Sequence, residues 1–385
     1  MTRADVIVVG LGGMGTAAAW QLARRGASVV GLEQFALGHD RGSSHGHTRI
    51  TRQAYYEHPA YVPLVRRAFE GWYDLEQARG VPLLLSSPCL TLGRPEGELV
   101  AGVRRSAAEH RLSIEELSAQ EVHRRYPAFR LDDAPDLVGV IEHTAGILLV
   151  DACVRALADE ARHLGARLRE NEPVVAWRRE GGTLVVETPR DRYEADRLVL
   201  TAGPWMGALL GRVGIPLRVM RQVALWLQPS DPVLFRRDRF PVYIAETPGG
   251  SFYGFPALDR RGAKVARHYG AEERPGPDGV DRTVTAADEA PVRTFVRAYL
   301  PSADGLRLDG SVCLYTLTPD RHFLIDHHPD AAGVVLAGGF SGHGFKFAPV
   351  VGEILADLAL TGATRWPIDL VAAARPTLAV AGRPE

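Results

Sequence analysis

The stretch D-V-I-V-V-G-L-G-G-M-G, residues 5–15, decides the fold of this chain. Its residues 6–9 are four consecutive β-branched residues, which predict a strand buried on both faces of a sheet. Gly10, Gly12 and Gly15 follow at once in the spacing G-x-G-x-x-G. The first glycine permits a tight turn, the second leaves room for a pyrophosphate, and the third lets a helix pack closely on the strand.

The residues that follow complete a strand–helix–strand unit. Residues 16–25 have the apolar spacing of a helix, Gly26 suits its carboxyl end, and residues 29–32 form a second apolar strand. Glu33 ends that strand, where a carboxylate can accept hydrogen bonds from ribose hydroxyls. The unit predicts a dinucleotide site with the helix amino terminus facing the phosphates, and it leaves open whether the dinucleotide is NAD or FAD.

Length, charge and hydropathy exclude several classes of protein. The 385 residues suffice for two domains, and a formal net charge of −1 implies no general attraction to nucleic acid or to anionic membranes. No uninterrupted apolar run long enough to span a membrane is present, and the amino terminus leads straight into the first strand, with no room for a signal peptide. We therefore expect a cytoplasmic protein without a membrane or nucleic-acid partner.

The cysteines do not form a recognisable framework. Cys89, Cys153 and Cys313 provide neither a set of disulfides nor a Cys-x-x-Cys pair. We expect no metal site.

Two further segments resemble ligand loops at the ends of strands. Residues 334–337 predict a strand that runs into G-G-F-S-G-H-G-F-K, residues 338–346, followed by a helix. Residues 196–205, D-R-L-V-L-T-A-G-P-W, predict a buried strand ending at Ala202 and Gly203, although a plain strand-to-helix turn would look the same. One glycine loop binds one pyrophosphate, so several such loops favour a larger cofactor. The residues therefore favour FAD over NAD.

A glycine-, serine- and histidine-rich loop follows the first strand–helix–strand unit. Residues 38–52, G-H-D-R-G-S-S-H-G-H-T-R-I-T-R, show neither helix nor strand periodicity. A solvated basic loop is one interpretation. Its position directly after the dinucleotide strand favours a loop that faces the cofactor.

The second half of the chain contains alternating strands with chemically active side chains. In residues 264–268, alternation places Lys264, Ala266 and His268 on one face, and Tyr253 can join them from a neighbouring strand. A solvated face is the common reason for such a pattern. Residues 311–318, S-V-C-L-Y-T-L-T, predict another alternating strand.

The remaining expectations concern local structure. Residues 83–92 and residues 242–255 each read as one continuous strand. Asp151 is expected to cap a long helix, and Ser118 with Glu121 three residues later fits a capping box.

These motifs together resemble the monomeric sarcosine oxidase and N-methyltryptophan oxidase family, within the D-amino acid oxidase-like FAD amine oxidases. The resemblance covers essentially the whole chain. It is carried by G-L-G-G-M-G with Glu33, G-S-S-H-G-H-T-R-I-T-R, T-A-G-P-W, F-Y-G-F-P, K-x-x-x-H, C-x-Y-T-x-T-x-D and G-F-S-G-H-G-F-K. The first and third motifs occur in many flavoproteins, whereas the second and the last four in this order are more specific.

The resemblance implies an α/β fold. It has a Rossmann-like FAD-binding domain and a second α+β substrate domain built on a largely antiparallel mixed sheet. The expected FAD-binding domain is discontinuous and comprises residues 1–80, 145–215 and 310–385. The expected substrate domain comprises residues 81–144 and 216–309.

The resemblance also implies roles for individual residues. Arg52 and Lys346 would hold the substrate carboxylate, and Tyr315 would also bind the substrate. Cys313 would form a covalent bond to the flavin. The implied catalytic residues have three roles. Lys264 would promote the reaction with O₂, His268 and Tyr253 would lie near the substrate amine, and Arg49 would pack against the flavin. The implied cofactor-binding residues are Gly10, Gly12, Gly13, Gly15, Glu33, Ser43, Ser44, His45, Thr48, Ala202, Gly203, Cys313, Gly339, Gly342 and Gly344.

The implied activity is FAD-dependent oxidation of a secondary amino acid, N-methylated or cyclic, such as sarcosine. O₂ would be reduced to hydrogen peroxide, and the imine would hydrolyse, giving formaldehyde and the demethylated amino acid from an N-methyl substrate. The partners are then a small secondary amino acid and O₂, and a monomer is expected. The alternatives are a flavin dehydrogenase that passes electrons to another acceptor, a flavin-binding protein without catalysis, and an NAD-linked dehydrogenase.

Overall fold

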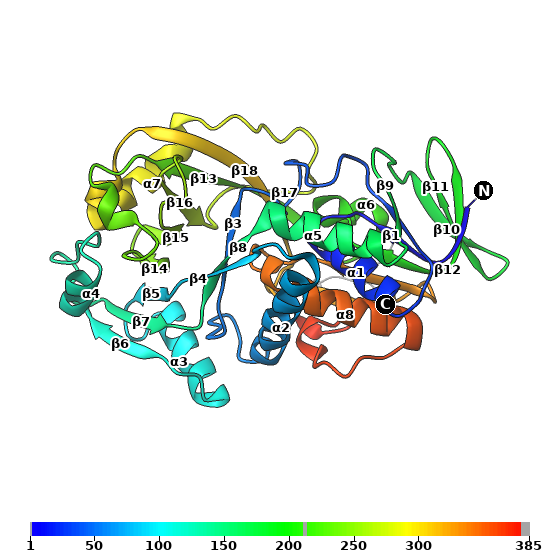
Figure 1. Ribbon diagram of the computed structural model, residues 1–385, viewed down its shortest axis with the longest axis horizontal. Coiled ribbons are helices and arrows are strands. Elements are labelled where there is room, and N and C mark those ends of the chain that lie inside the picture. The colour runs from blue at the N-terminus through cyan, green and yellow to red at the C-terminus, as the bar shows by residue number, and fades with distance from the viewer. Residues whose placement is uncertain (1, 211–213, 379–385) are drawn as a thin grey trace.

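The computed structural model describes residues 2–210 and 214–378 as an elongated molecule with a sheet toward each end (Figure 1). Parts of the expected FAD-binding segments, residues 1, 211–213 and 379–385, lie outside the described residues. Three sheets are present in the described part of the chain, with eight, nine and three strands.

The eight-stranded sheet contains the opening strand of the chain at its centre. Its strands are β1 (Thr2–Val9), β2 (Val29–Leu32), β9 (Arg167–Arg169), β10 (Ala176–Glu180), β11 (Thr183–Glu187), β12 (Arg192–Leu200), β19 (Leu324–His327) and β20 (Val334–Gly338). β1 pairs in parallel with β2 and β12, and β12 pairs in parallel with β20. The carboxyl ends of these four strands therefore meet at one edge of the sheet, which is where ligands bind in open α/β folds.

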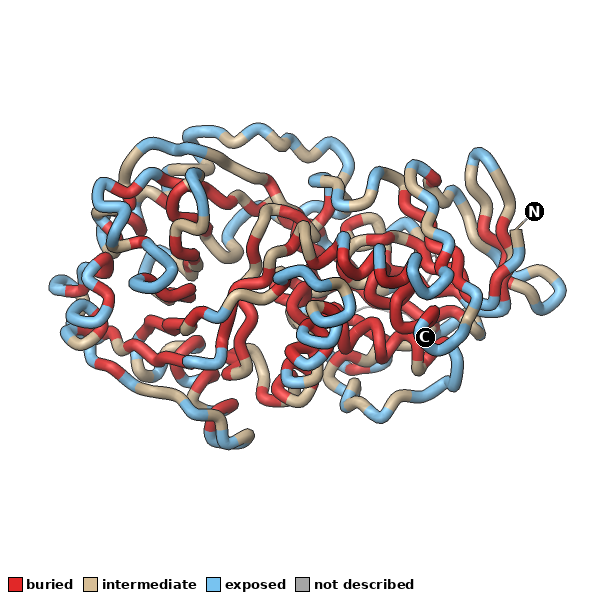
Figure 2. Tube along the Cα trace, in the orientation of Figure 1, coloured by how far each residue is buried: buried red, intermediate tan, exposed pale blue. Residues whose placement is uncertain are grey.

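Four helices pack together beside this sheet. They are α1 (Gly13–Arg24), α2 (Tyr61–Arg79), α5 (Val150–His163) and α8 (Ala348–Thr361). α1 contacts α5 and α8, and all four helices share one apolar core with β1 and β20. Figure 2 shows this core as the densest concentration of buried chain in the molecule. The amino terminus of α1 is thereby held rigidly at the ligand edge.

The nine-stranded sheet lies at the other end of the molecule (Figure 1). Its strands are β5 (Cys89–Gly93), β6 (Glu115–Ser118), β7 (Val138–Glu142), β13 (Arg218–Leu227), β14 (Val242–Thr247), β15 (Gly250–Phe255), β16 (Ala263–His268), β17 (Glu273–Arg274) and β18 (Arg307–Leu317). Only β14 and β5 pair in parallel among these described strands. The helices of this half are α3 (Glu98–His110), α4 (Ala119–Arg125) and α7 (Ala286–Tyr299). The predicted α/β fold with a largely antiparallel mixed second sheet is confirmed.

A small antiparallel sheet and a short helix complete the described elements. The sheet contains β3 (Thr48–Thr51), β8 (Gly146–Leu149) and β4 (Leu84–Ser86), and α6 spans Met206–Leu209. None of the described helices has the length and apolar character required to cross a membrane.

Three local predictions were wrong. The strand expected over residues 83–92 is two strands, β4 and β5, in different sheets, because Pro88 has no N–H to donate to a ladder between them. The strand expected over residues 242–255 is a hairpin of β14 and β15 that turns at Pro248 and Gly249. Asp151 does not cap α5. It lies in the first turn of the helix, where its charge still suits the helix dipole. The capping box of Ser118 and Glu121 is confirmed.

The contact of α1 with α8 requires a glycine. A Cβ at Gly352 would lie 2.5 Å from the backbone oxygen of Ala17. We predict that Gly352→Ala lowers the free energy of unfolding by about 1–3 kcal/mol through overpacking, although alanine ordinarily favours a helix. Urea unfolding measures the effect.

Gly207→Ala in α6 is the matched control, because nothing lies within 4 Å of the added Cβ. We expect its stability to be unchanged or slightly raised. A Gly352→Ala protein as stable as the wild type would show that the two helices can separate without cost.

Candidate active site

The glycines after β1 are required by close contacts. Gly10 has a φ of +86°, and a Cβ there would lie 2.7 Å from the oxygen of Thr201. A Cβ at Gly15 would lie 1.8 Å from the oxygen of Gly10, so no side chain fits between α1 and β1. These contacts set the amino terminus of α1 between the ends of β1 and β12, where its first residues, Gly13 and Met14, line a cavity.

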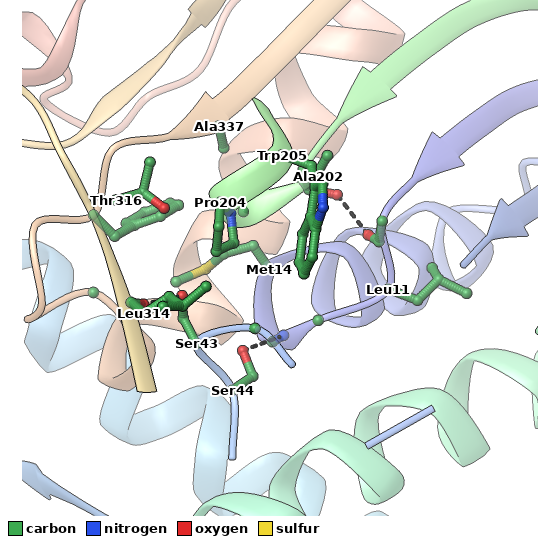
Figure 3. Close-up of a pocket in the computed structure, with 18 of the residues that line it drawn as sticks. Leu11, Met14, Ser43, Ser44, Ala202, Pro204, Trp205, Leu314, Thr316 and Ala337 are labelled. Atoms are coloured by element: carbon green, nitrogen blue, oxygen red, sulfur yellow. Dashed lines mark hydrogen bonds between the residues drawn. The ribbon is translucent and has the colours of Figure 1, made fainter. Parts of the chain in front are cut away.

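This cofactor cavity runs along the shared carboxyl edge of the four parallel strands. The predicted cofactor residues that line it are Gly10, Gly12, Gly13, Glu33, Ser43, Ser44, Ala202, Gly203, Cys313, Gly339, Gly342 and Gly344. Gly15, His45 and Thr48 are outside this lining. Figure 3 shows side chains from four separate segments around the same space: Ser44 near the start of α1, Trp205 and Pro204 after β12, Leu314 and Thr316 on β18, and Ala337 on β20.

Two side chains hold the glycine loop in shape. Ser44 Oγ accepts a hydrogen bond from the N–H of Gly13 at 3.0 Å. Glu33 accepts from the N–H of Leu11 at 2.8 Å and from that of Phe35 at 3.1 Å. A carboxylate has about four acceptor sites, so these bonds leave capacity for a ribose hydroxyl. The glycine cradle, the amino terminus of α1 and this carboxylate together fit FAD.

A second cavity adjoins the first, and both are lined by Arg49, Cys313 and Tyr315. We call it the amino-acid cavity because Arg52 and Lys346, the residues that the resemblance assigns to a substrate carboxylate, line it. One face of the nine-stranded sheet forms its wall. Strand register places Tyr253 opposite Ala266, and Ala224 opposite both Ala266 and Ser311. The predicted residues that line the cavity are His45, Arg49, Arg52, Tyr253, Lys264, His268, Cys313, Tyr315, Gly342 and Lys346.

The predicted grouping of Tyr253, Lys264 and His268 on one face is therefore confirmed. The alternative of a solvated face is wrong, because Lys264 is only 3% exposed. Residues about two hundred positions apart in sequence, such as Arg52 and Lys264, line the same space.

A compact charged group occupies one end of the amino-acid cavity. Arg52 Nη2 donates to both carboxylate oxygens of Glu57, at 3.1 and 2.9 Å, and its guanidinium lies over the Tyr55 and Tyr56 rings. Burial alone would raise the pKa of Glu57, but Arg52, His343 and Lys346 together outweigh burial and lower that pKa to about 2. Lys346 Nζ donates to the backbone oxygen of His343 at 2.7 Å. Burial and then the neighbouring Arg52 lower the pKa of Lys346 to about 7.

His268, Tyr315 and Tyr253 form an aromatic group in the same cavity. His268 Nδ1 lies 3.1 Å from the Tyr315 hydroxyl, and its ring meets that of Tyr253 edge to face with centroids 6.0 Å apart. Burial lowers the pKa of His268 to about 3, so its imidazole is neutral at pH 7. Burial also raises the pKa of both tyrosines, which keeps their hydroxyls protonated. The group offers neutral hydrogen-bonding atoms rather than charge.

Lys264 is fixed by three oxygen atoms. Its Nζ donates to Gly46 O at 2.7 Å, to Thr48 Oγ1 at 3.1 Å and to Thr48 O at 3.2 Å. It also lies over the rings of Trp226 and Phe255, at 4.8 and 5.0 Å from their centroids. Burial and then Arg49 hold the pKa of Lys264 well below its usual value. An ammonium of lowered pKa is a readier proton donor than an exposed lysine.

Cys313 lies in a positively charged environment at the junction of the two cavities. Arg49 Nη2 is 3.4 Å from its sulfur and also donates to Ser43 O at 2.8 Å. Burial would raise the pKa of the thiol, but Arg49 and then His45 lower it to about 7. Burial instead raises the pKa of Cys89 and Cys153. Cys313 is thus the cysteine with thiolate character at neutral pH.

The sequence prediction missed several lining residues. Glu57 and Tyr56 line the amino-acid cavity. The sequence signal for them was an acidic residue directly after two tyrosines, in R-Q-A-Y-Y-E-H at residues 52–58. His343 sits within the glycine motif and contacts Tyr55 through its Nδ1 at 2.7 Å. Gln222 faces the cavity because it pairs with Cys313 across β13 and β18, a register that no local pattern reveals.

Comparisons with known proteins agree with this geometry. The model of the FAD dependent oxidoreductase family matches residues 5–358. Monomeric sarcosine oxidase of Streptomyces avermitilis is 44% identical over 95% of this chain and 96% of its own. N-methyl-L-tryptophan oxidase of Salmonella arizonae is 35% identical over 92% of this chain and 94% of its own. Among solved structures, NikD, described as an unusual amino acid oxidase essential for nikkomycin biosynthesis, superimposes with a TM-score of 0.85 at 26% identity, over 97% of this chain and 98% of its own.

The chain belongs to the FAD dependent oxidoreductase family. It is an enzyme that uses FAD, and the resemblance seen in the sequence is confirmed by relatives that cover nearly its full length.

Proposed function

We propose that this enzyme oxidises a secondary amino acid, N-methylated or cyclic, with O₂ as the electron acceptor. The observation that carries the proposal is the amino-acid cavity, whose lining combines the cations Arg52 and Lys346 with His268, Tyr315 and Cys313. The names of the relatives, which specify sarcosine and N-methyl-L-tryptophan, support the substrate class. The imine product hydrolyses, and an N-methyl substrate yields formaldehyde and the demethylated amino acid.

Arg52 and Lys346 bind the substrate carboxylate. A planar guanidinium and a point-like ammonium together fix one end of an amino acid. Before substrate binds, Glu57 neutralises Arg52 through the two bonds to Nη2. The substrate carboxylate then competes with Glu57 for this cation, which limits the site to ligands that supply an acid group at this position.

The substrate amine lies next to neutral groups. FAD supplies the two-electron acceptor when it is bound. An ammonium has no lone pair to assist cleavage of the adjacent C–H bond, so the amine must lose its proton first. Because the pKa of His268 is lowered to about 3, its uncharged ring can accept a hydrogen bond from the amine N–H. Tyr315 orients that ring through the contact at His268 Nδ1.

Lys264 donates a proton during reduction of O₂. Its three oxygen partners hold the ammonium in place, and its lowered pKa eases release of the proton. The positive charge also stabilises negative charge that develops on O₂.

The domain division and the assembly state are further parts of this proposal. We infer that residues 1–80, 145–215 and 310–385 form the FAD-binding domain and residues 81–144 and 216–309 the substrate domain. The separate eight- and nine-stranded sheets support this division. A monomer is favoured by the word monomeric in the names of relatives such as the Streptomyces avermitilis enzyme.

The activity is tested by incubating the purified enzyme with sarcosine, pipecolate and N-methyl-L-tryptophan and measuring hydrogen peroxide. We expect peroxide with at least one of them, and a fall of about 100-fold or more in kcat/KM for Arg52→Met, which removes a charged partner of the carboxylate. Bleaching of the flavin by these substrates without peroxide in air would favour the dehydrogenase alternative. Absence of bleaching would contradict the substrate class.

We also propose that Cys313 bonds covalently to the flavin, supported by the low pKa of its thiol beside Arg49 and His45. Acid precipitation of the wild-type enzyme should leave the yellow colour in the pellet, whereas Cys313→Ala should release it into the supernatant. Cys153→Ala is the control, because its buried thiol has a raised pKa and is outside both cavities. A colourless wild-type pellet would contradict the bond.

The lowered pKa of Lys346 predicts that carboxylate binding depends on pH. Glycine betaine is a suitable ligand, because its quaternary nitrogen has no proton to lose. The pKa of Lys346 in the free enzyme is about 7, so its ammonium is present below pH 7 and is lost as the pH rises above it. Betaine affinity, measured from flavin absorbance, should therefore fall by up to about tenfold per pH unit above 7. Lys346→Met should remove this dependence, and an unchanged profile would contradict the assignment.

A further inference from the structure

Two residues other than glycine have a left-handed backbone and are bonded to each other. Tyr269, in the turn after β16, has a φ of +65°, and Ser341, in the loop of residues 338–346, has a φ of +49°. The Tyr269 hydroxyl donates a hydrogen bond to Ser341 O at 2.7 Å. A side chain disfavours this backbone conformation, and residues that keep it cluster at functional sites. The pair is therefore a candidate for a functional role.

The Tyr269 ring packs against the imidazole of His268. The centroids of the two rings are 3.9 Å apart. His268 also meets Tyr253 edge to face, and its Nδ1 lies 3.1 Å from the Tyr315 hydroxyl. These three residues line the amino-acid cavity, whereas Tyr269 is not part of its lining. Tyr269 therefore supports the His268 ring from behind the cavity wall.

The hydroxyl of Tyr269 fixes the orientation of a peptide group. Ser341 is fully buried, its N–H donates to Thr316 O at 2.8 Å, and Tyr269 is the donor that the described residues supply to its carbonyl. Because the next peptide bond is planar and trans, a fixed Ser341 carbonyl directs the N–H of Gly342 the opposite way. Gly342 lines both the cofactor cavity and the amino-acid cavity. One tyrosine thus orients a peptide group where the two cavities meet.

A further contact holds the Tyr269 ring itself. The Arg321 guanidinium lies 5.4 Å from the ring centroid, within the range of a cation–π interaction. Arg321 is paired with Glu273 of β17 at 2.6 Å, and β17 pairs with β13 in the nine-stranded sheet. A ring with partners on several elements keeps one orientation, as a residue that positions others must.

Resting on the amine oxidation proposed above, we propose that Tyr269 is a positioning residue for that reaction. It keeps the His268 ring in place for the substrate amine and, through Ser341, keeps the peptide group at Gly342 in place at the cofactor cavity. Misplacement of either group changes the alignment of the reacting C–H bond, which slows oxidation without weakening carboxylate binding.

Tyr269→Asn tests the proposal, because it removes the ring and the bond to Ser341 while asparagine tolerates the left-handed backbone. The holoenzyme is reduced anaerobically with whichever of the three amino acids above reduces it fastest, and the rate is followed by flavin absorbance. We expect the rate at saturating substrate to fall by about tenfold or more, since lost alignment at the reacting atoms is costly. The dissociation constant of glycine betaine should stay within about twofold, because Arg52 and Lys346 are untouched.

Tyr269→Phe separates the ring from the hydroxyl. It keeps the ring on His268 and removes only the bond to Ser341, so we expect a reduction rate between those of the wild type and Tyr269→Asn. Arg111→Asn is the matched control, because it introduces the same residue at an exposed position with a φ of +54°, beyond α3 and outside both cavities. Its reduction rate should equal that of the wild type.

A second readout does not depend on activity. Crystal structures should keep the contact of His268 Nδ1 with the Tyr315 hydroxyl in Tyr269→Phe and lose it in Tyr269→Asn. If Tyr269→Asn does not fold, Tyr269→Gly replaces it, because glycine adopts the left-handed backbone freely.

Three outcomes would overturn the positioning role. They are an unmoved His268 ring in the variant that lacks the tyrosine ring, a reduction rate of that variant equal to the wild type, and a loss of betaine affinity in parallel with the rate. Failure of all three amino acids to reduce the wild-type flavin would instead contradict the proposed function, and the crystal structures would still show whether Tyr269 positions His268.

Discussion

The parallel pairing of β2, β1, β12 and β20 is the constraint on which the rest of the structure depends. Parallel strands point the same way, so their four carboxyl ends and the loops that follow lie at one edge. The absence of a side chain at Gly15 lets α1 approach β1 and aim its amino terminus at that edge. The cofactor cavity is the consequence of this backbone arrangement rather than of any one side chain.

The chemistry depends on a second constraint, the burial of charged groups on one sheet face. Alternation along β16 puts Lys264 and His268 on the same face, and the register with β15 adds Tyr253. Burial lowers the pKa of Lys264 and keeps His268 neutral. For Cys313, the nearby Arg49 and His45 lower the thiol pKa to about 7, although burial would raise it. The same burial explains why Arg52 carries its own counter-ion, Glu57: an unpaired buried guanidinium would be costly.

The sequence was a good guide where the signal is local. The strand–helix–strand unit around Gly10 and the capping box at Ser118 each depend on neighbours within a few residues, and both were predicted correctly. The sequence was a poor guide where one apolar run contains two strands, as on either side of Pro88 and of Gly249. The alternation of apolar residues is the same in both strands, so it does not reveal the turn between them. Gln222 was not predicted because it reaches the cavity through its pairing with Cys313, which is distant in the sequence. Glu57 was not predicted because it lies outside the sequence motifs, although it binds Arg52.

The sequence by itself determined the class of cofactor, the strand faces that carry Lys264 and Cys313, and the family resemblance, because glycine spacing and two-residue alternation are properties of the local chain. The tertiary structure alone decided that Arg52 is already paired with Glu57, that the pKa of Lys346 falls to about 7, and that Gly46 and Thr48 hold the Lys264 amine. These properties arise from desolvation and from distances between residues on separate elements. Neither quantity is defined until the chain has folded.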